Sequence, residues 1–143
     1  MKTTIEIKVR GYHVDHFNHV NNARYLEFLE EARWDYCEKN NLINEFHHRG
    51  MMHVTVSTTI NYRKSAHVGQ VLKIGTEVSG ITGKRLVMGQ NIYDLKTDIL
   101  IADAMVTNVF LDVNTGKALP VDASVSRFWP DLSTVENREG LHK

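Results

Sequence analysis

The sequence predicts an α+β domain in which an antiparallel sheet of about five strands wraps around one long helix. Polar and apolar residues alternate along residues 4–9, recur at helical spacing from about Asn21, and alternate again almost to residue 112. Alternation is typical of strands, whereas recurrence every three or four residues is typical of a helix. A single helix among five strands must bury its apolar stripe against the sheet, which gives the predicted class.

The long helix is expected to begin at Asn21 or Asn22 and to end around Lys39. Both asparagines are suitable N-caps, because a short polar side chain can accept hydrogen bonds from the free N–H groups of the first turn. The apolar residues that define its buried stripe are Tyr25, Leu26, Phe28, Leu29, Ala32 and Tyr36. A linker that carries His47, His48 and Gly50 is expected to follow.

Four long strands are predicted after this linker. In the first, Val54, Val56, Thr58, Ile60 and Tyr62 alternate with polar residues and are expected to share one face. The next three are expected over residues 71–79, 85–95 and 99–112. Short turns join them, so they should form an antiparallel meander. From about residue 121 we expect a partly helical extension, which Pro130 interrupts.

Length and composition restrict the class of protein. A chain of 143 residues is expected to form one domain, residues 1–143, and 17 basic residues balance 17 acidic ones, so no net charge attracts nucleic acid. No apolar run approaches a membrane span, and the N-terminus lacks the apolar region of a secretion signal, which favours the cytoplasm. The single cysteine, Cys37, excludes an internal disulfide. Because the sheet should keep an open edge strand, we expect a homodimer or homotetramer.

The segment from Gly11 to Tyr36, GYHVDHFNHVNNARYLEFLEEARWDY, carries the most functional information. Its acid, Asp15, lies on a loop that leads directly into the predicted helix near Asn22. A helix N-terminus offers unpaired N–H groups and a partial positive charge, which can polarise a carbonyl. Asp15 is therefore either an ordinary loop aspartate or the carboxylate of an acyl-transfer site.

A resemblance to a known family favours the second interpretation. The stretches KVRGYH and HVNNARYLEFLEEARWD resemble the hydroxybenzoyl-CoA thioesterase group of hotdog-fold proteins, and within it the bacterial long-chain acyl-CoA thioesterases of type III. The likeness extends to about Pro120. It implies a hydrolase of fatty acid metabolism that converts acyl-CoA to free acid and CoA without a cofactor.

The resemblance also implies roles for individual residues. Asp15 corresponds to the catalytic aspartate, and the backbone N–H of Asn22, seven residues on, corresponds to the amide that faces the thioester carbonyl. His19 matches the histidine of an HVNNxxY motif shared with acyl-carrier-protein thioesterases, and it should support Asp15 or the thioester. The asparagine that precedes this histidine by two residues in those enzymes is replaced here by Phe17, which argues against that specificity. Asp15 is expected to act as a general base or as a nucleophile.

Further residues are expected to shape the site or bind substrate. Asn21 and Tyr25 should shape it, and four basic residues at strand ends are candidates for the phosphates of CoA. These four are Arg63, Lys64, Lys84 and Arg85. The helix glutamates are reserve candidates for the catalytic carboxylate. They are Glu27, Glu30 and Glu31.

Other chemistries receive less support from the sequence. His13, His16 and His19 recur every third residue, but no HExxH or CxxC spacing accompanies them, so no metal is expected. An acyl tunnel could be lined by Trp34, Tyr36, Met51, Met52 and Met88. The rival functions are a thioesterase for acyl-carrier protein or an aromatic acyl-CoA, a dehydratase, and a non-catalytic acyl-CoA sensor.

Overall fold

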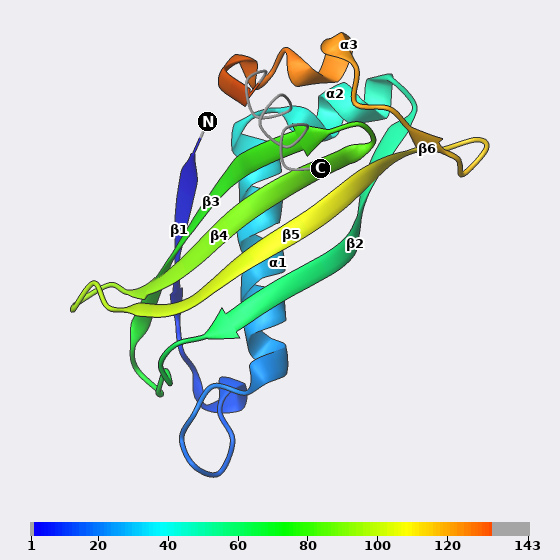
Figure 1. The fold of residues 1–143 in the computed structure, drawn as a ribbon. Helices are drawn as coiled ribbons and strands as arrows, with labels where there is room; N and C mark the ends of the chain where they lie inside the picture. Colours follow the sequence, from blue (N-terminus) through cyan, green and yellow to red (C-terminus); the bar gives the residue numbers. More distant parts are fainter. Residues whose placement is uncertain (1, 133–143) are drawn as a thin grey trace.

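A computed structural model describes residues 2–132 of the chain, and it shows an antiparallel sheet curved around one long helix (Figure 1). The helix, α1, spans Asn22–Lys39. The strands are β1 (Thr3–Lys8), β2 (Met51–Tyr62), β3 (Val71–Thr82), β4 (Arg85–Asp94), β5 (Leu100–Asp112) and β6 (Ala118–Leu119). Their order is β1-β3-β4-β5-β2, and β6 pairs with β5. The predicted α+β class and the β3-β4-β5 meander are confirmed.

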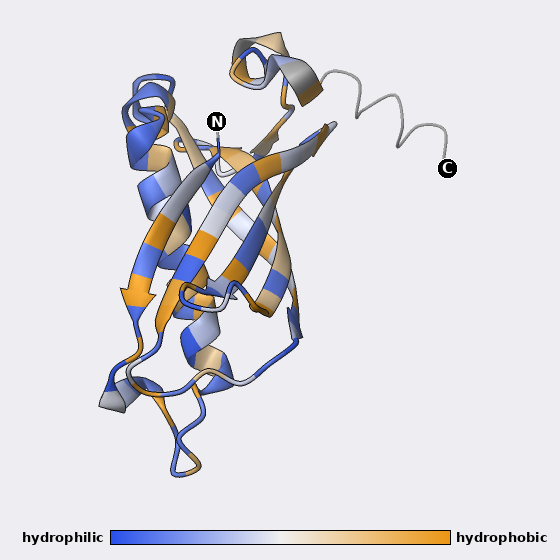
Figure 2. Cartoon of the chain, turned by 90° about the vertical axis from the view of Figure 1, so that its left-hand side faces the viewer, coloured by the Kyte–Doolittle hydropathy of each residue, from blue (hydrophilic) through white to orange (hydrophobic). Residues whose placement is uncertain are grey.

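Helix α1 lies in the concave face of the sheet and buries the stripe that the sequence indicates, except for Leu26, which is 46% exposed. Tyr25, Phe28, Leu29 and Ala32 are buried against sheet residues such as Ile74. Along β4, buried and half-buried residues alternate with a period of two, and Figure 2 shows the matching bands of hydrophobic and hydrophilic residues on the strands. This packing fixes the direction of the helix and therefore the position of its N-terminus.

A buried polar contact also fastens the helix to the sheet. The Nε2 of Gln90 on β4 donates to the backbone oxygen of Leu29 at 2.9 Å and to Oγ1 of Thr76 at 3.0 Å. Its Oε1 accepts from Nη1 of Arg33 at 3.0 Å. Gln90 and Thr76 are each only 1% exposed, and a buried amide that is fully hydrogen-bonded favours one arrangement over sliding alternatives.

The face predicted for β2 is wrong at its first half. The pairing with β5 shifts between Thr55 and Ser57, so Val56 forms a β-bulge and is 56% exposed. A bulge inserts one residue into a strand and moves the alternation by one position. Thr55 and Thr58 therefore stand opposite the buried Asn108 and Val106, whereas Val56 has no partner.

The linker predicted after α1 contains a second, short helix, α2 (Leu42–His48). Asn41 adopts a left-handed conformation with a φ of 56° and turns the chain between the two helices. Leu42 and Phe46, four residues apart, lie on one side of α2, and both are buried. Burial of this pair gives the segment a tertiary reason to be helical that its polar composition does not suggest.

Two short helical segments, α3 (Ala123–Ser126) and η2 (Pro130–Leu132), lie where a broken helix is predicted. The buried side chains of Val125 and Trp129 join the core, and Nε1 of Trp129 donates to the hydroxyl of Tyr36 at 2.7 Å. The prediction for residues 133–136 lies outside the described residues. No helix among residues 2–132 is long and apolar enough to cross a membrane.

Candidate active site

The loop that precedes α1 is a closed turn. Val14 and Val20 form an antiparallel bridge at its base, and the N–H of Asp15 donates to the oxygen of His19 at 2.9 Å. The N–H of Asn18 donates to the oxygen of Asp15 at 3.0 Å, and Asn18 has a φ of 60°. Asparagine is one of the few residues that tolerate this left-handed conformation. The sequence DHFN therefore folds into one compact turn, the Asp15 turn.

The carboxylate of Asp15 is held by backbone groups of its own turn. Its Oδ1 accepts from the N–H of Phe17 at 2.9 Å and from the N–H of His19 at 3.2 Å. The hydrogen bond from His19, aided by the one from Phe17, lowers the pKa of Asp15 below its ordinary value of 3.8. Asp15 is therefore ionised at neutral pH. Among the described residues, none donates to Oδ2, which leaves this oxygen available for chemistry.

The N-terminus of α1 lies directly beyond this turn. Asn21 is the N-cap, and its Oδ1 accepts from the N–H of Ala23 at 3.0 Å. The N–H of Arg24 donates to the oxygen of Asn21 at 2.9 Å. Within residues 2–132 the N–H of Asn22 has no acceptor, so it is the free donor of the first turn.

A cleft of about 390 Å³ brings the Asp15 turn and this free donor together. Its lining comes from the turn, the start of α1, and the end of β2. The lining residues are Asp15, His19, Val20, Asn21, Asn22, Tyr25, Tyr62, Arg63, Lys64 and Ser65. Every predicted catalytic residue is therefore in one cleft, together with Asn21, Tyr25 and two of the four basic candidates.

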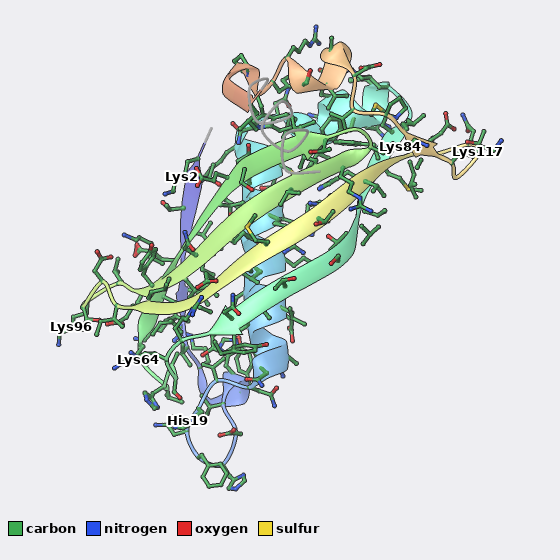
Figure 3. All side chains as sticks on the ribbon, in the orientation of Figure 1. Lys2, His19, Lys64, Lys84, Lys96 and Lys117 are labelled. Carbon is green, nitrogen blue, oxygen red and sulfur yellow. The ribbon has the colours of Figure 1, made fainter. Side chains whose placement is uncertain are left out.

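The other two basic candidates lie elsewhere. Figure 3 shows Lys84 at the opposite end of the sheet from His19 and Lys64, and Arg85 is its neighbour at the start of β4. The structure thus does not bring Lys84 and Arg85 to the cleft of the same chain. Short turns occur at both ends of an antiparallel sheet, and the sequence pattern alone does not distinguish the two ends.

The two basic residues of the cleft differ in their surroundings. Nε of Arg63 donates to Oδ2 of Asp103 at 2.8 Å, and this bond raises the pKa of Arg63. Among the described residues, Lys64 forms no ion pair. Lys64 is therefore the cation of this cleft whose charge is not already matched by a carboxylate.

His19 contacts Asp15 through its backbone, as described above, and not through its ring. The imidazole instead packs edge-on against His67, with 5.2 Å between the ring centroids. Three residues of the cleft, Val20, Tyr62 and Ser65, are not among the sequence candidates. The hydroxyl of Tyr62 donates to the oxygen of Asn22 at 3.4 Å. Its position directly before Arg63 and Lys64, at the end of a strand, is the signal that could have identified it.

A larger cavity of about 900 Å³ lies between α1 and β2, and Tyr62 borders both spaces. Of the tunnel candidates, Trp34, Met51 and Met52 line this cavity, whereas Tyr36 and Met88 are fully buried in the core. Of the reserve carboxylates, Glu27 and Glu30 border it and Glu31 does not.

Among the residues that line this larger cavity, Cys37 is a possible nucleophile by residue type alone. Burial raises the pKa of its thiol to about 11, so the thiol stays protonated at neutral pH. A protonated thiol is a poor nucleophile, so Cys37 is not a candidate for nucleophilic attack.

The histidines of the Asp15 loop do not converge. His13 is buried, its Nδ1 accepts from the N–H of Arg10 at 2.9 Å, and burial lowers its pKa. His16 packs against Phe17 instead. Residues 2–132 contain no group of three or more histidine, cysteine or acidic side chains arranged to hold a metal ion.

Residues 9–128 match the family described as the thioesterase-like superfamily. The chain belongs to this superfamily. The family match and the thioesterase relatives confirm the prediction that the protein is a thioester hydrolase. The presence of an ionised aspartate and a free helix amide in one cleft is consistent with this reaction.

Comparisons with individual proteins show the likeness in detail. The chain is 41% identical over 120 residues to the long-chain acyl-CoA thioesterase FadM of Escherichia coli, which covers 84% of this chain and 91% of the relative. It is 31% identical over 109 residues to the acyl-acyl carrier protein thioesterase ATL2 of Arabidopsis thaliana, covering 76% of this chain and 58% of that one. The crystal structure of YbaW, a probable thioesterase from Escherichia coli, matches with a TM-score of 0.84 and 38% identity over 90% of this chain and 97% of that one. The hotdog fold expected from the resemblance is confirmed.

Proposed function

We propose that the protein is a cytoplasmic acyl-CoA thioesterase that hydrolyses long-chain fatty acyl-CoA to the free fatty acid and CoA, with Asp15 as its catalytic carboxylate. The observation that carries this proposal is the shared cleft of Asp15 and the free N–H of Asn22. The 41% identity to a long-chain acyl-CoA thioesterase supports the choice of substrate.

The geometry supports a division of labour between these two groups. The thioester carbonyl accepts a hydrogen bond from the N–H of Asn22, where the positive end of the α1 dipole stabilises the charge that develops on oxygen. Oδ2 of Asp15 faces the carbonyl carbon. The carbon becomes tetrahedral when a nucleophile adds to it. As this intermediate collapses, the C=O bond re-forms, the C–S bond breaks and the CoA thiolate leaves, so no strong general acid is needed.

Two reaction paths fit this arrangement. In the first, Asp15 removes a proton from water, and the resulting hydroxide attacks the carbonyl carbon. In the second, Oδ2 attacks the carbon directly, and water then hydrolyses the mixed anhydride. A single turnover in ¹⁸O-labelled water distinguishes the two paths. If water opens the anhydride at the Asp15 carbonyl, the label enters the Asp15 side chain, whereas the general-base path puts it only in the fatty acid.

The proposal gives a position to each end of the substrate. Lys64, which has no ion pair among the described residues, binds a phosphate of CoA in this proposal, and Arg63 supports this end while it holds Asp103. Beyond Tyr62, the cavity of about 900 Å³ offers an apolar path for the acyl chain, with Leu26 and Trp34 on one side and Ile60 on the other.

The proposal is tested by measuring thiol release from acyl-CoAs of graded chain length, with matching acyl-carrier-protein and aromatic acyl-CoA substrates beside them. We expect kcat/KM to rise toward the long acyl-CoAs and to exceed the value for the same chain on carrier protein. The name of the Arabidopsis relative describes that enzyme as an acyl-acyl carrier protein thioesterase. If this protein also has a higher kcat/KM for acyl chains on carrier protein than on CoA, the proposed substrate class is wrong. Tight binding of acyl-CoA without thiol release would favour the sensor.

The proposal includes a homodimer or a homotetramer built from such dimers. Strand β2 pairs only with β5 among the described strands, so its other edge is open. Apolar residues of large size are exposed beside this edge, on α1 and on β2. They are Leu26, Trp34, Met52, Val56 and Tyr62. A second copy that pairs with this edge would cover them and narrow the cavity between α1 and β2.

We expect the wild type to have a mass in solution of two or four times 16.4 kDa, and Trp34→Glu to reduce it to that of one chain. The substitution puts a charge in the centre of the apolar face, where Trp34 is 55% exposed in the single chain. Light scattering on a size-exclusion column gives the mass. Ile99→Glu, at an exposed turn away from this face, is the control, and a monomeric wild type would contradict the proposal.

A further inference from the structure

The Asp15 turn rests against a second turn, residues 66–70, which connects β2 to β3. The N–H of Val20 donates to the oxygen of Ala66 at 2.9 Å, and the rings of His19 and His67 are in contact. The two turns are 46 or more residues apart in the sequence, so their contact is a property of the fold.

Asn18 forms most of the hydrogen bonds between the two turns. Its Oδ1 accepts from the N–H of Val68 at 3.1 Å, and its backbone oxygen lies 2.8 Å from Nδ1 of His67. Because a carbonyl oxygen can only accept, Nδ1 of His67 carries the proton of this bond. The left-handed φ of 60° at Asn18 turns both oxygens toward the 66–70 turn while its N–H stays on the oxygen of Asp15.

The 66–70 turn is itself fastened to the sheet. The N–H of His67 donates to Oε1 of Gln70 at 2.5 Å, and Nε2 of Gln70 donates to Oδ1 of Asp94 at 3.4 Å. The backbone of the turn also exchanges two hydrogen bonds of 2.9 Å with Val9. Asp94 is 6% exposed and accepts from both the N–H and the hydroxyl of Thr97. Asn18 therefore binds to a part of the molecule that is held in place.

Within residues 2–132, Asp15 forms no comparable contacts with other parts of the molecule. Its side chain is exposed, and its two hydrogen bonds come from Phe17 and His19 within the same turn. The carboxylate therefore moves with the Asp15 turn, and the contacts that hold this turn determine its position relative to the N–H of Asn22. A displacement of the reacting group by about 1 Å can cost about 10²-fold in rate.

We infer that Asn18 is a positioning residue, which locks the Asp15 turn to the 66–70 turn and so sets the distance from the Asp15 carboxylate to the carbonyl bound at Asn22. The inference rests on the proposed function. It assigns to Asn18 and His67 a role in the rate of the reaction and none in contact with substrate.

The test uses Asn18→Gly, which keeps the left-handed backbone and removes the oxygen that binds Val68. We expect kcat to fall about tenfold while KM changes less than about twofold, because the acyl-CoA contacts remain. Asn41→Gly is a matched control, since Asn41 also has a positive φ, 56°, and lies at the far end of α1.

Conservative variants test the hydrogen bonds themselves. Asn18→Asp, which keeps the acceptor oxygen, should retain most of the kcat that Asn18→Gly loses. His67→Asn should likewise retain more activity than His67→Ala, because an amide can still donate to the oxygen of Asn18.

A double-mutant cycle with Asp15→Asn separates positioning from a general structural role. If Asn18 acts through Asp15, then Asn18→Gly lowers the residual rate of Asp15→Asn by less than about twofold. Equal losses in both backgrounds, or a lower Tm with an unchanged kcat, would overturn the inference. Full activity of Asp15→Asn alone would instead overturn the proposed role of Asp15, so the two failures are distinguishable.

Discussion

Asp15→Asn is expected to lower kcat for long-chain acyl-CoA by about 10³-fold, the loss typical of removing a general base or nucleophile. The amide keeps one oxygen for the N–H groups of Phe17 and His19, so the turn should persist. What disappears is the negative charge at Oδ2. Thiol release under saturating substrate measures the effect, and KM should change little, since Asp15 is not placed to bind CoA.

The chain supplies a close control for this substitution. At the other end of the sheet, Oδ1 of Asp112 accepts from the N–H groups of Asn114 and Thr115 at 2.8 and 3.0 Å. Like Asp15, Asp112 is thus held by two backbone donors of its own turn, although the second donor is three residues on instead of four. Asp112→Asn should therefore leave kcat unchanged. Comparable losses in both variants would show that the effect comes from weakening an aspartate turn and would contradict a catalytic role for Asp15.

The acidity of Asp15 also has a measurable consequence. Because the N–H of His19 lowers its pKa below 3.8, protonation of Asp15 should not limit kcat/KM until the pH falls below that value. The lowered pKa stabilises the ionised form, so activity that depends on this carboxylate is present above its folded-state pKa and is lost as the pH falls through it.

The sequence predicts the structure around the candidate site well because the signals there are local. A polar N-cap and an apolar stripe at helical spacing define where α1 begins, and the Asp15 loop is adjacent to it in the chain. The proximity of Asp15 to Asn22 therefore needs no long-range contact. The position of Arg63 and Lys64 in the same cleft does depend on a long-range contact, because β2 ends beside the N-terminus of α1.

The features that the sequence does not reveal depend on pairings between distant segments. The bulge at Val56 exists only relative to β5, and no alternation of apolar residues in β2 marks it. The position of Lys84 follows from the direction of a hairpin in the sheet. The contacts of Asn18 with Val68 and His67 join turns that are unrelated in sequence. In each case the residue type permits the feature, and the tertiary structure decides it.

Asn22→Pro should lower kcat by about 10²–10³-fold without unfolding the protein, because it removes one catalytic N–H and little else. Asn22 is the first residue of α1, the position at which proline is favoured in helices since the N–H there has no partner within the helix. The preceding residue, Asn21, has φ −63° and ψ 138°, an extended conformation that a following proline accepts.

The backbone origin of this effect is testable with a second variant. Asn22→Ala removes the side chain and keeps the N–H, so its kcat should fall by less than about threefold, a small part of the loss in Asn22→Pro. Circular dichroism and Tm establish that both variants keep α1. If the proline variant folds and turns over long-chain acyl-CoA at the rate of the alanine variant, the carbonyl is not bound at this amide. The charge that develops on its oxygen would then have to be stabilised elsewhere in the cleft, where Lys64 is a cation that forms no ion pair among the described residues.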